Sequence, residues 1–170
     1  MVRKFETGVK RDDTSGTFRI RNALFVALIG SGLFFLLSLV TYSFNDPGWS
    51  ASGGNLPIEN MAGVTGAFLA DVFFSIIGLC AYSLPLLFAY AAFTLLRKSD
   101  LPEKVDWLLL SLRGASLFIL IAASTALFSL NDFGGLRLPQ GAGGILGSVV
   151  ASGFDQAFNP IGSRLILVAL

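Results

Sequence analysis

Residues 23–44, ALFVALIGSGLFFLLSLVTYSF, decide the fold because they contain no charged side chain. A helix rises about 1.5 Å per residue, so about 20 apolar residues cross a hydrocarbon core of about 30 Å. The stretch is also longer than the apolar region of a signal peptide. We therefore predict a first transmembrane helix over residues 23–44, preceded by a tail over residues 1–22.

The composition of the whole chain agrees with a membrane protein. Of its 170 residues, 54% are hydrophobic and only 14% are charged, whereas a soluble domain carries about 25% charged residues. The chain has no His, which removes the commonest general base and metal ligand. Its single cysteine, Cys80, excludes an intramolecular disulfide and a multi-cysteine metal site. We predict no cofactor or metal site in these residues.

Further apolar stretches predict an all-α, four-span helical bundle. The stretch at 66–96 is longer than one crossing needs, so its first part is expected at the membrane interface and the span after it. Pro85 predicts a bend within that second span. Residues 107–130 form the third span. Residues 161–170 supply about half a crossing, so the sequence is expected to continue and complete a fourth.

Basic residues predict the orientation of these spans. Ten of the twelve lie in the tail, in the loop over residues 97–106, or just after it at Arg113. The opposite loops, at 45–65 and 131–160, together with the start of the fourth span, contain the other two. Because cytoplasmic loops are enriched in Lys and Arg, the N terminus is predicted to be cytoplasmic. The basic tail is interpreted as a topology signal that contacts lipid, and nucleic-acid binding is the alternative.

Two charged residues lie within or beside apolar segments. Asp71 falls near the predicted outer end of the second span and is interpreted as an interfacial anchor or helix-start residue, with partner contact or a proton relay as alternatives. Arg113 is expected to extend back to the inner interface. Contact with a polar group inside the bundle, or with a ligand, is its alternative role.

The glycine-rich run PQGAGGILGSVVASGF, residues 139–154, resembles a phosphate-binding loop only in composition. It lacks the GxxxxGK[ST] arrangement and has no basic residue beside its glycines. It is predicted to be a flexible turn that enters a short amphipathic segment, around residues 145–158, on the outer membrane surface. The chain contains no GxSxG motif and no paired carboxylates, so it is not predicted to be an enzyme.

Two motifs, TYSFNDPGWS at 41–50 and NMAGVTGAFLADVFFSIIGLCAYSLPLLF at 60–88, identify a resemblance. They are similar to the N-terminal four-span domain of FtsK-type bacterial DNA translocases, and PQGAGGILGSVV at 139–150 resembles that family's second outer loop. The resemblance covers residues 23–170. It implies a membrane anchor for a hexameric, ATP-driven DNA pump at the division septum, in contact with other division proteins. DNA, ATP and Mg²⁺ would be bound by a motor outside these residues.

The DPGWS turn supplies most candidate contact residues. Asp46, Pro47 and Gly48 are typical turn residues, and the Trp49 ring is expected at headgroup level. Asp46 is interpreted as capping the turn, with direct partner contact as the alternative. These four residues, together with Asp71 and Arg113, are the candidates for an interface with a partner.

A small transporter or channel subunit is the alternative function. It requires polar residues at the bilayer midplane, or broken helices at matching positions of two halves. Only Pro85 indicates a broken helix, and the sequence shows no evident internal repeat. An intramembrane enzyme would need a His, a catalytic Ser motif or an acid pair, and the sequence contains none.

Overall fold

The computed structural model describes residues 13–53, 57–97, 106–131 and 137–169. Within those ranges every regular element is a helix, which confirms the predicted all-α fold. The basic tail over residues 1–12 and most of the inner loop, residues 98–105, lie outside the described residues. The predictions that depend on them therefore stay predictions.

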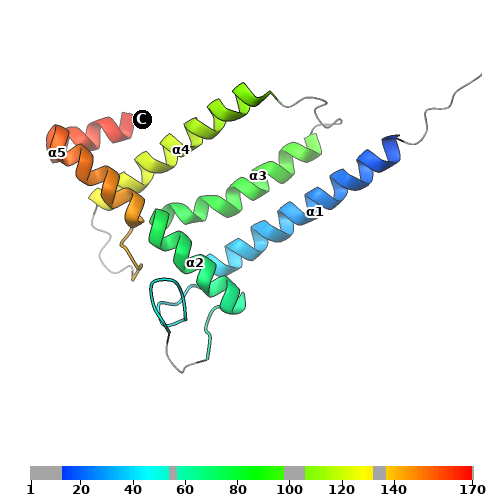
Figure 1. Ribbon diagram of the computed structural model, residues 1–170, viewed down its shortest axis with the longest axis horizontal. Coiled ribbons are helices and arrows are strands. Elements are labelled where there is room, and N and C mark those ends of the chain that lie inside the picture. The colour runs from blue at the N-terminus through cyan, green and yellow to red at the C-terminus, as the bar shows by residue number, and fades with distance from the viewer. Residues whose placement is uncertain (1–12, 54–56, 98–105, 132–136, 170) are drawn as a thin grey trace, which may run out of the picture.

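Five α-helices and one short 3₁₀-helix follow one another along the described part of the chain (Figure 1). Helices α1, α3 and α4 run along roughly the same direction, whereas α2 and the start of α5 run across them. The elements are α1 (Asp13–Val40), α2 (Gly63–Ile77), η1 (Gly78–Tyr82), α3 (Ser83–Arg97), α4 (Trp107–Leu130) and α5 (Gly144–Ala169).

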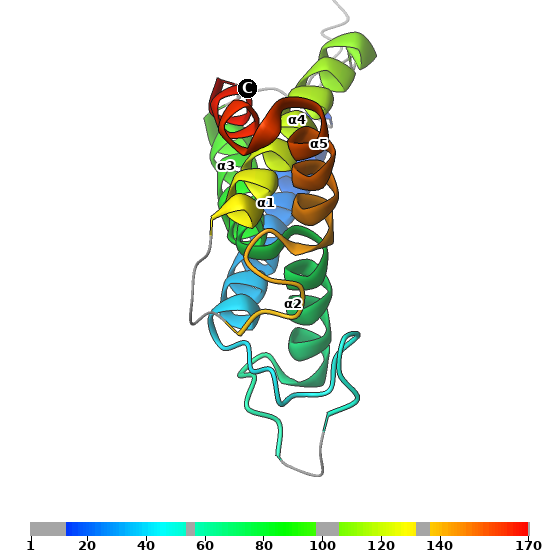
Figure 2. The ribbon, with the colours of Figure 1, turned by 90° about the vertical axis from the view of Figure 1, so that its left-hand side faces the viewer.

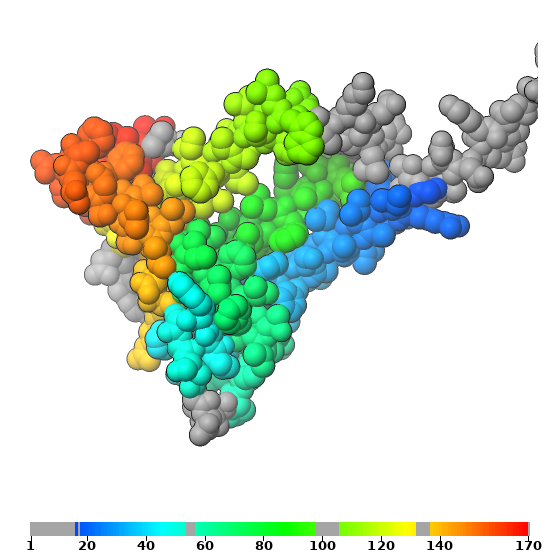
Figure 3. Space-filling view, viewed as in Figure 1, coloured from blue at the N-terminus to red at the C-terminus, as the bar shows by residue number. Residues whose placement is uncertain are grey.

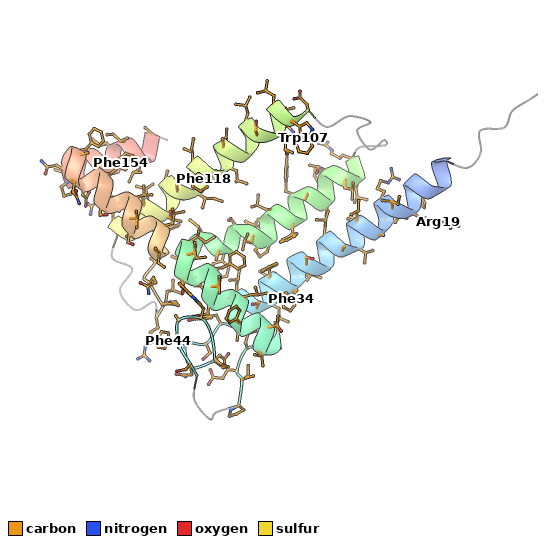
Figure 4. All side chains as sticks on the ribbon, in the orientation of Figure 1. Arg19, Phe34, Phe44, Trp107, Phe118 and Phe154 are labelled. Carbon is orange, nitrogen blue, oxygen red and sulfur yellow. The ribbon has the colours of Figure 1, made fainter. Side chains whose placement is uncertain are left out.

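Three helical stretches of the described residues are long and apolar enough to cross a membrane: Phe18–Val40, Gly63–Arg97 and Trp107–Leu130. Figure 4 shows Arg19 at one end of the molecule and Phe44 at the other. We call the end near Arg19 the inner end and the end near Phe44 the outer end. The α5 helix is the fourth long helix of the domain.

The second apolar stretch breaks at Gly78, and the predicted bend at Pro85 is wrong. Gly78 has a φ of 55°, and the chain passes through η1 before α3 begins at Ser83. Pro85 lies in the first turn of α3, where its missing N–H would have no acceptor within the helix anyway. The conformational freedom of glycine therefore sets the change of direction.

Helices α1 and α3 pack closely along their length. A β-carbon at Gly32 would lie 3.1 Å from Cβ of Phe88, so the absence of a side chain lets the two backbones approach. Phe35 stacks on Phe88, with ring centroids 5.5 Å apart, and meets Phe73 edge-on. These contacts hold α1 and α3 together as a pair.

Two small hydrophobic clusters lie toward the outer half of the molecule. The first joins α1 to α2 and η1, and the second joins α4 to both parts of α5. The first consists of Leu39, Ala70, Phe74 and Ala81, and the second of Ala123, Ala126, Ala151 and Leu167. Small residues dominate both clusters, which is typical of helices that approach closely in lipid.

The α5 helix changes direction at Asn159, which has a φ of 61° and precedes Pro160. Its last part turns back along α4 (Figure 1), where the Arg164 guanidinium donates to the Leu130 carbonyl at 3.0 Å. Ser163 and Leu167 are buried in that contact. The segment from Gly144 therefore comprises two helical pieces of different direction.

Candidate functional site

Asp71 holds the outer loop against α2. It lies in the middle of α2 and is only 3% exposed, so it does not begin a helix. Its carboxylate accepts hydrogen bonds from the Tyr42 hydroxyl at 2.9 Å and from the Ser50 amide and hydroxyl at 2.6 and 2.7 Å. Three donors from one loop therefore converge on a single carboxylate.

Asp46 performs the same task within the loop. It is 5% exposed and accepts the backbone N–H groups of Glu59 and Asn60, at 2.8 and 2.9 Å. The Asn60 amide in turn donates to the Ser38 carbonyl at 2.8 Å. Asp46 thus ties together the two ends of the outer loop, 13 and 14 residues apart. We call Asp46, Asp71 and their bonding partners the carboxylate clasp.

Glycine is required where the loop meets the clasp. A β-carbon on Gly48 would lie 2.6 Å from the nearest carboxylate oxygen of Asp71, closer than real contacts allow. At Gly66 a β-carbon would collide with the Ala62 side chain. The DPGWS turn is therefore shaped to fit against α2, and Pro47 is half-buried within it.

The clasp changes the acidity of its tyrosine. Burial raises the pKa of the Tyr42 hydroxyl above its ordinary value, and the hydrogen bond to Asp71 and the charges of Asp71 and Asp46 raise it further. Tyr42 therefore remains a neutral donor to the carboxylate. Because both carboxylates already accept several hydrogen bonds, the arrangement positions a loop and does not provide an acid–base pair.

Two of the six candidate contact residues point outward. Trp49 is 56% exposed, although its neighbours in the turn are held by the clasp. Arg113 lies on the first half of α4, where every residue from 106 to 120 is exposed. Figure 3 shows this half of α4 as a ridge along the upper edge of the molecule. The clasp carboxylates, in contrast, are buried within the chain.

A second contact region lies where the glycine-rich run meets η1. The Leu79 amide donates to the Ala142 carbonyl at 2.8 Å, and a β-carbon on Gly78 would collide with the same carbonyl. A β-carbon on Gly144 would lie 2.7 Å from the Gly78 nitrogen. Figure 3 shows this run seated against the end of α2.

The same run also packs tightly on α4. A β-carbon at either Gly143 or Gly147 would collide with the Thr125 carbonyl oxygen. We call Gly78, Gly143, Gly144 and Gly147 the glycine junction; all four are buried. The predicted turn before residue 145 is present, and its glycines serve close backbone packing.

Sequence reasoning missed several residues of both regions. Tyr42, Ser50 and Asn60 matched the family pattern but received no role, and Gly78 was not recognised as the break. A polar residue beside an apolar segment was the available signal for the first three, because buried polar groups need partners. The described residues contain no group of His, Cys, Asp and Glu able to hold a metal ion.

Comparisons with known proteins match this arrangement to one family. Residues 18–170 match the model of the 4TM region of DNA translocase FtsK/SpoIIIE. A DNA translocase FtsK from Pseudomonas syringae pv. syringae is 36% identical over 90% of this chain and 19% of its own length. One from Vibrio parahaemolyticus is 32% identical over 99% of this chain and 17% of its own length. No solved structure matches the chain.

Proposed function

The chain belongs to the FtsK/SpoIIIE family of DNA translocases as its four-transmembrane region, and on that premise we propose what it does for the whole protein. The domain anchors a translocase in the membrane. We propose further that it associates with other copies of itself, contacts division proteins and holds a motor at the division septum. The motor is not in this chain, which spans about a fifth of its relatives' length. ATP, Mg²⁺ and DNA would be bound there.

The exposed first half of α4 carries the proposal of self-association. In lipid, exposed apolar side chains need no partner, whereas a charge at the helix centre costs about 2.5–3.5 kcal/mol. For Arg113 this cost is relieved by extension to the inner interface or by a partner helix, and we propose the second. Ser116 lies one turn after Arg113 on the same face of α4, and small residues let helices approach closely. Within the chain, α4 contacts α5, α2 and η1, and its buried residues all lie in its second half. The first half is therefore left free for another copy.

Self-association is tested by Arg113→Leu in detergent-solubilised or nanodisc-embedded protein. We expect the variant to shift from the wild-type assembly toward monomer, measured by mass. Arg164→Leu is the matched control, since that guanidinium bonds the Leu130 carbonyl within the chain. If the mass of Arg113→Leu and that of the control are both unchanged, the first half of α4 is not the surface through which copies associate.

The clasp supports the proposal of partner contact at the outer end, because it fixes the loop while leaving Trp49 exposed. A rigidly presented aromatic ring is a common anchor of protein interfaces. In the full-length translocase, Trp49→Ala should weaken septal placement and division. Trp107→Ala, at the inner end and 74% exposed, is the control. Normal septal placement of the Trp49 variant would contradict this role.

Orientation in the membrane is tested by reporter fusions at positions 55, 102 and 140. We expect a cytoplasmic signal at 102 and an outer signal at 55 and 140, following the distribution of basic residues. A cytoplasmic signal at 55 would reverse the assignment. Extending the reading frame past Leu170 should reveal a GxxxxGK[ST] motif, whose absence would remove the motor from the proposal.

A transporter receives less support from the geometry. Both chain breaks, at Gly78 and Asn159, lie beside the outer ends of other helices: Arg164, just past the second break, donates to the carbonyl of Leu130 in the last turn of α4. The Tyr82 hydroxyl, just past the first break, donates to the carbonyl of Leu39 in the last turn of α1. Substrate sites of transporters with broken helices lie near the midplane. The clasp carboxylates already have partners.

A further inference from the structure

We propose that residues 38–78 and 124–159 are two copies of one structural unit, docked to each other through Gly78. Within the same proposal, three positions, Met61, Asn159 and Pro160, block a further unit from docking in the same way. The break at Gly78 therefore accepts only the second unit of the same chain.

The sequence contains a repeat at the end of each unit's first helix. SLVTYSFND at 38–46 aligns with STALFSLND at 124–132, with four of nine positions identical. Tyr42 aligns with Phe128, a second aromatic residue. This match is the first observation that favours an internal repeat, where none was expected. The repeat is hidden because the outer loops that follow differ in length by five residues.

After the loops, a second set of matches has a constant spacing. The residues Gly63, Gly66 and Ala70 on α2 correspond to Gly144, Gly147 and Ala151 on α5, each 81 residues later. Gly66, Ala70 and their counterparts are buried. The small residues thus serve the same face of each oblique helix.

Backbone conformation repeats at the same spacing. Gly63 has a φ of 72° and Gly144 a φ of 65° at the starts of the two helices. At their ends, Gly78 has a φ of 55° and Asn159 a φ of 61°. Positive φ is uncommon for residues other than glycine, so its occurrence in a non-glycine residue at this register is evidence of a shared backbone path.

The units also agree in space. In Figures 1 and 2, α2 and the first part of α5 run in the same direction. Helices α1 and α4 run in parallel before them, and α3 and the last part of α5 both turn back toward the inner end (Figure 1). Inside each unit the oblique helix rests on the preceding helix: the Ser38 hydroxyl donates to the Gly66 carbonyl, and Gly147 packs on the carbonyl of Thr125, one position past the counterpart of Ser38.

The contact between the units is asymmetric. The turn that starts the second oblique helix, at Ala142 and Gly144, inserts into the break that ends the first, at Gly78 and Leu79. Helices α3 and α4 make no contact with each other in the described residues. The units therefore meet mainly at this outer junction. A contact of this head-to-tail kind would, if repeated, join units without limit.

The break that ends the second unit cannot receive another turn. Its residue is Asn159 where the first unit has Gly78, and a β-carbon at Gly78 already collides with the inserted carbonyl. The next residue is Pro160 where the first unit has Leu79, so the N–H that donates to Ala142 is missing. Asn159 thus fills the space that docking needs, and Pro160 lacks the N–H that docking uses.

The turn that starts the first unit is also altered. Met61 stands where the second unit has Ala142, and its side chain is 73% exposed. Gly63 keeps the positive φ of Gly144 but has nothing within 4 Å of a β-carbon. This turn therefore has the backbone conformation of the inserting turn. No described residue contacts it in the way that Gly78 contacts the second unit, and the Met61 side chain would hinder such a contact.

The docking claim is tested by Gly78→Asn, with Gly63→Asn as control in the full chain in nanodiscs. Both sites have positive φ, so both substitutions strain the backbone, but only Gly78 faces a backbone carbonyl. We expect amide exchange of residues 78–82 to rise roughly tenfold or more in the first variant only. Wild-type exchange in Gly78→Asn would overturn the claim. Circular dichroism checks that both variants remain helical.

The blocking claim is tested by the triple variant Met61→Ala, Asn159→Gly and Pro160→Leu. At positions 159 and 160 it introduces the Gly and Leu that the first unit has at 78 and 79. At position 61 it introduces the Ala that the second unit has at 142. We expect masses at multiples of the wild-type assembly, and wild-type masses for Met61→Ala alone, which keeps the block at position 159. An unchanged mass distribution in the triple variant would overturn the claim. Because wild type is the reference, this outcome is separate from Arg113-dependent association.

Discussion

The two loop-to-helix connections of this domain follow similar backbone paths but are held by different chemistry. The first is fixed by carboxylates: Asp46 and Asp71 accept five hydrogen bonds from loop residues. The second is fixed by the absence of side chains, since Gly143 and Gly147 rest directly on the Thr125 carbonyl. A connection near lipid can therefore satisfy its polar groups with side-chain acceptors or by direct backbone contact.

The difference predicts different sensitivities. The carboxylate clasp should respond to loss of charge, because its donors bond to carboxylates, and to high pH through the raised pKa of Tyr42. The glycine junction should respond to added volume and be indifferent to charge. Substitutions of each kind therefore test whether the two connections are as distinct as their contacts indicate.

The largest effect is expected from Asp71→Ala. It leaves the Tyr42 hydroxyl and both Ser50 donors without this acceptor, and an unsatisfied buried donor costs about 1–3 kcal/mol. Because Ser50 is exposed and water can partly replace the carboxylate, we expect a total of about 2–4 kcal/mol. Denaturant unfolding in detergent micelles measures it.

Asp106→Ala is the control for that substitution. Asp106 is also a carboxylate that accepts one backbone N–H, from Leu109 at 3.1 Å, but it is an exposed helix cap. Its loss should cost about 1 kcal/mol. Equal losses for the two variants would show that the clasp contributes no more than an ordinary cap.

Gly147→Ala is expected to have the next largest effect. Its new methyl group would collide with the Thr125 carbonyl, and overpacking of this kind costs about 1–3 kcal/mol. Gly153→Ala, on the same helix with nothing within 4 Å, should instead stabilise the protein by about 0.5–1 kcal/mol. Unfolding of both variants measures the difference in sign. A stabilising Gly147 variant would contradict tight packing at the junction.

The sequence predicted those parts of the fold that depend on local composition. The crossing segments followed from runs of apolar residues, since hydropathy over about 20 residues is a local property. The break at Gly78 did not follow, because proline marks a break by its own chemistry whereas a glycine breaks a helix only when a neighbour demands it. Here the neighbour is Ala142, 64 residues away.

The candidate site was predicted in part for a similar reason. Asp46 and Asp71 stood out as charges beside apolar segments. Their partners did not, because Tyr42 lies 29 residues from Asp71 and a pairing over that distance leaves no periodic pattern. The proposed repeat was hidden by loops of unequal length, and only the shared backbone angles at Gly78 and Asn159 revealed its register.

The third effect concerns Asn60, which links the clasp to α1. Asn60→Ala removes the donor to the Ser38 carbonyl and the acceptor of the Ala62 amide. Since Asn60 is buried, we expect a loss of about 1–3 kcal/mol. Increased amide exchange in residues 57–66, with α4 unchanged, would confirm that the loss is local. Exchange rising throughout the protein would indicate general unfolding instead.

The smallest effect is a pH-dependent change in the stability difference between wild type and Tyr42→Phe. At neutral pH, Tyr42→Phe removes one hydrogen bond to a carboxylate, at a cost of about 1.5–3 kcal/mol before allowance for water at this half-buried site. Above about pH 10 the unfolded tyrosine loses its proton, while the folded one keeps it because its pKa is raised. The unfolded state then binds fewer protons, so wild-type stability falls as pH rises.

The Tyr42→Phe variant has no proton to lose at this position, so the stability difference between it and wild type should narrow between about pH 10 and pH 11. After solvent screening of a half-buried group, the narrowing should be below about 1 kcal/mol. Other titrating groups cancel in this difference. In an Asp71→Asn background the carboxylate charge is absent, so the narrowing should shrink. If the stability curves of wild type and Tyr42→Phe stay parallel from about pH 7 to pH 11, the clasp does not hold Tyr42 neutral. The clasp would then be as indifferent to pH as the glycine junction.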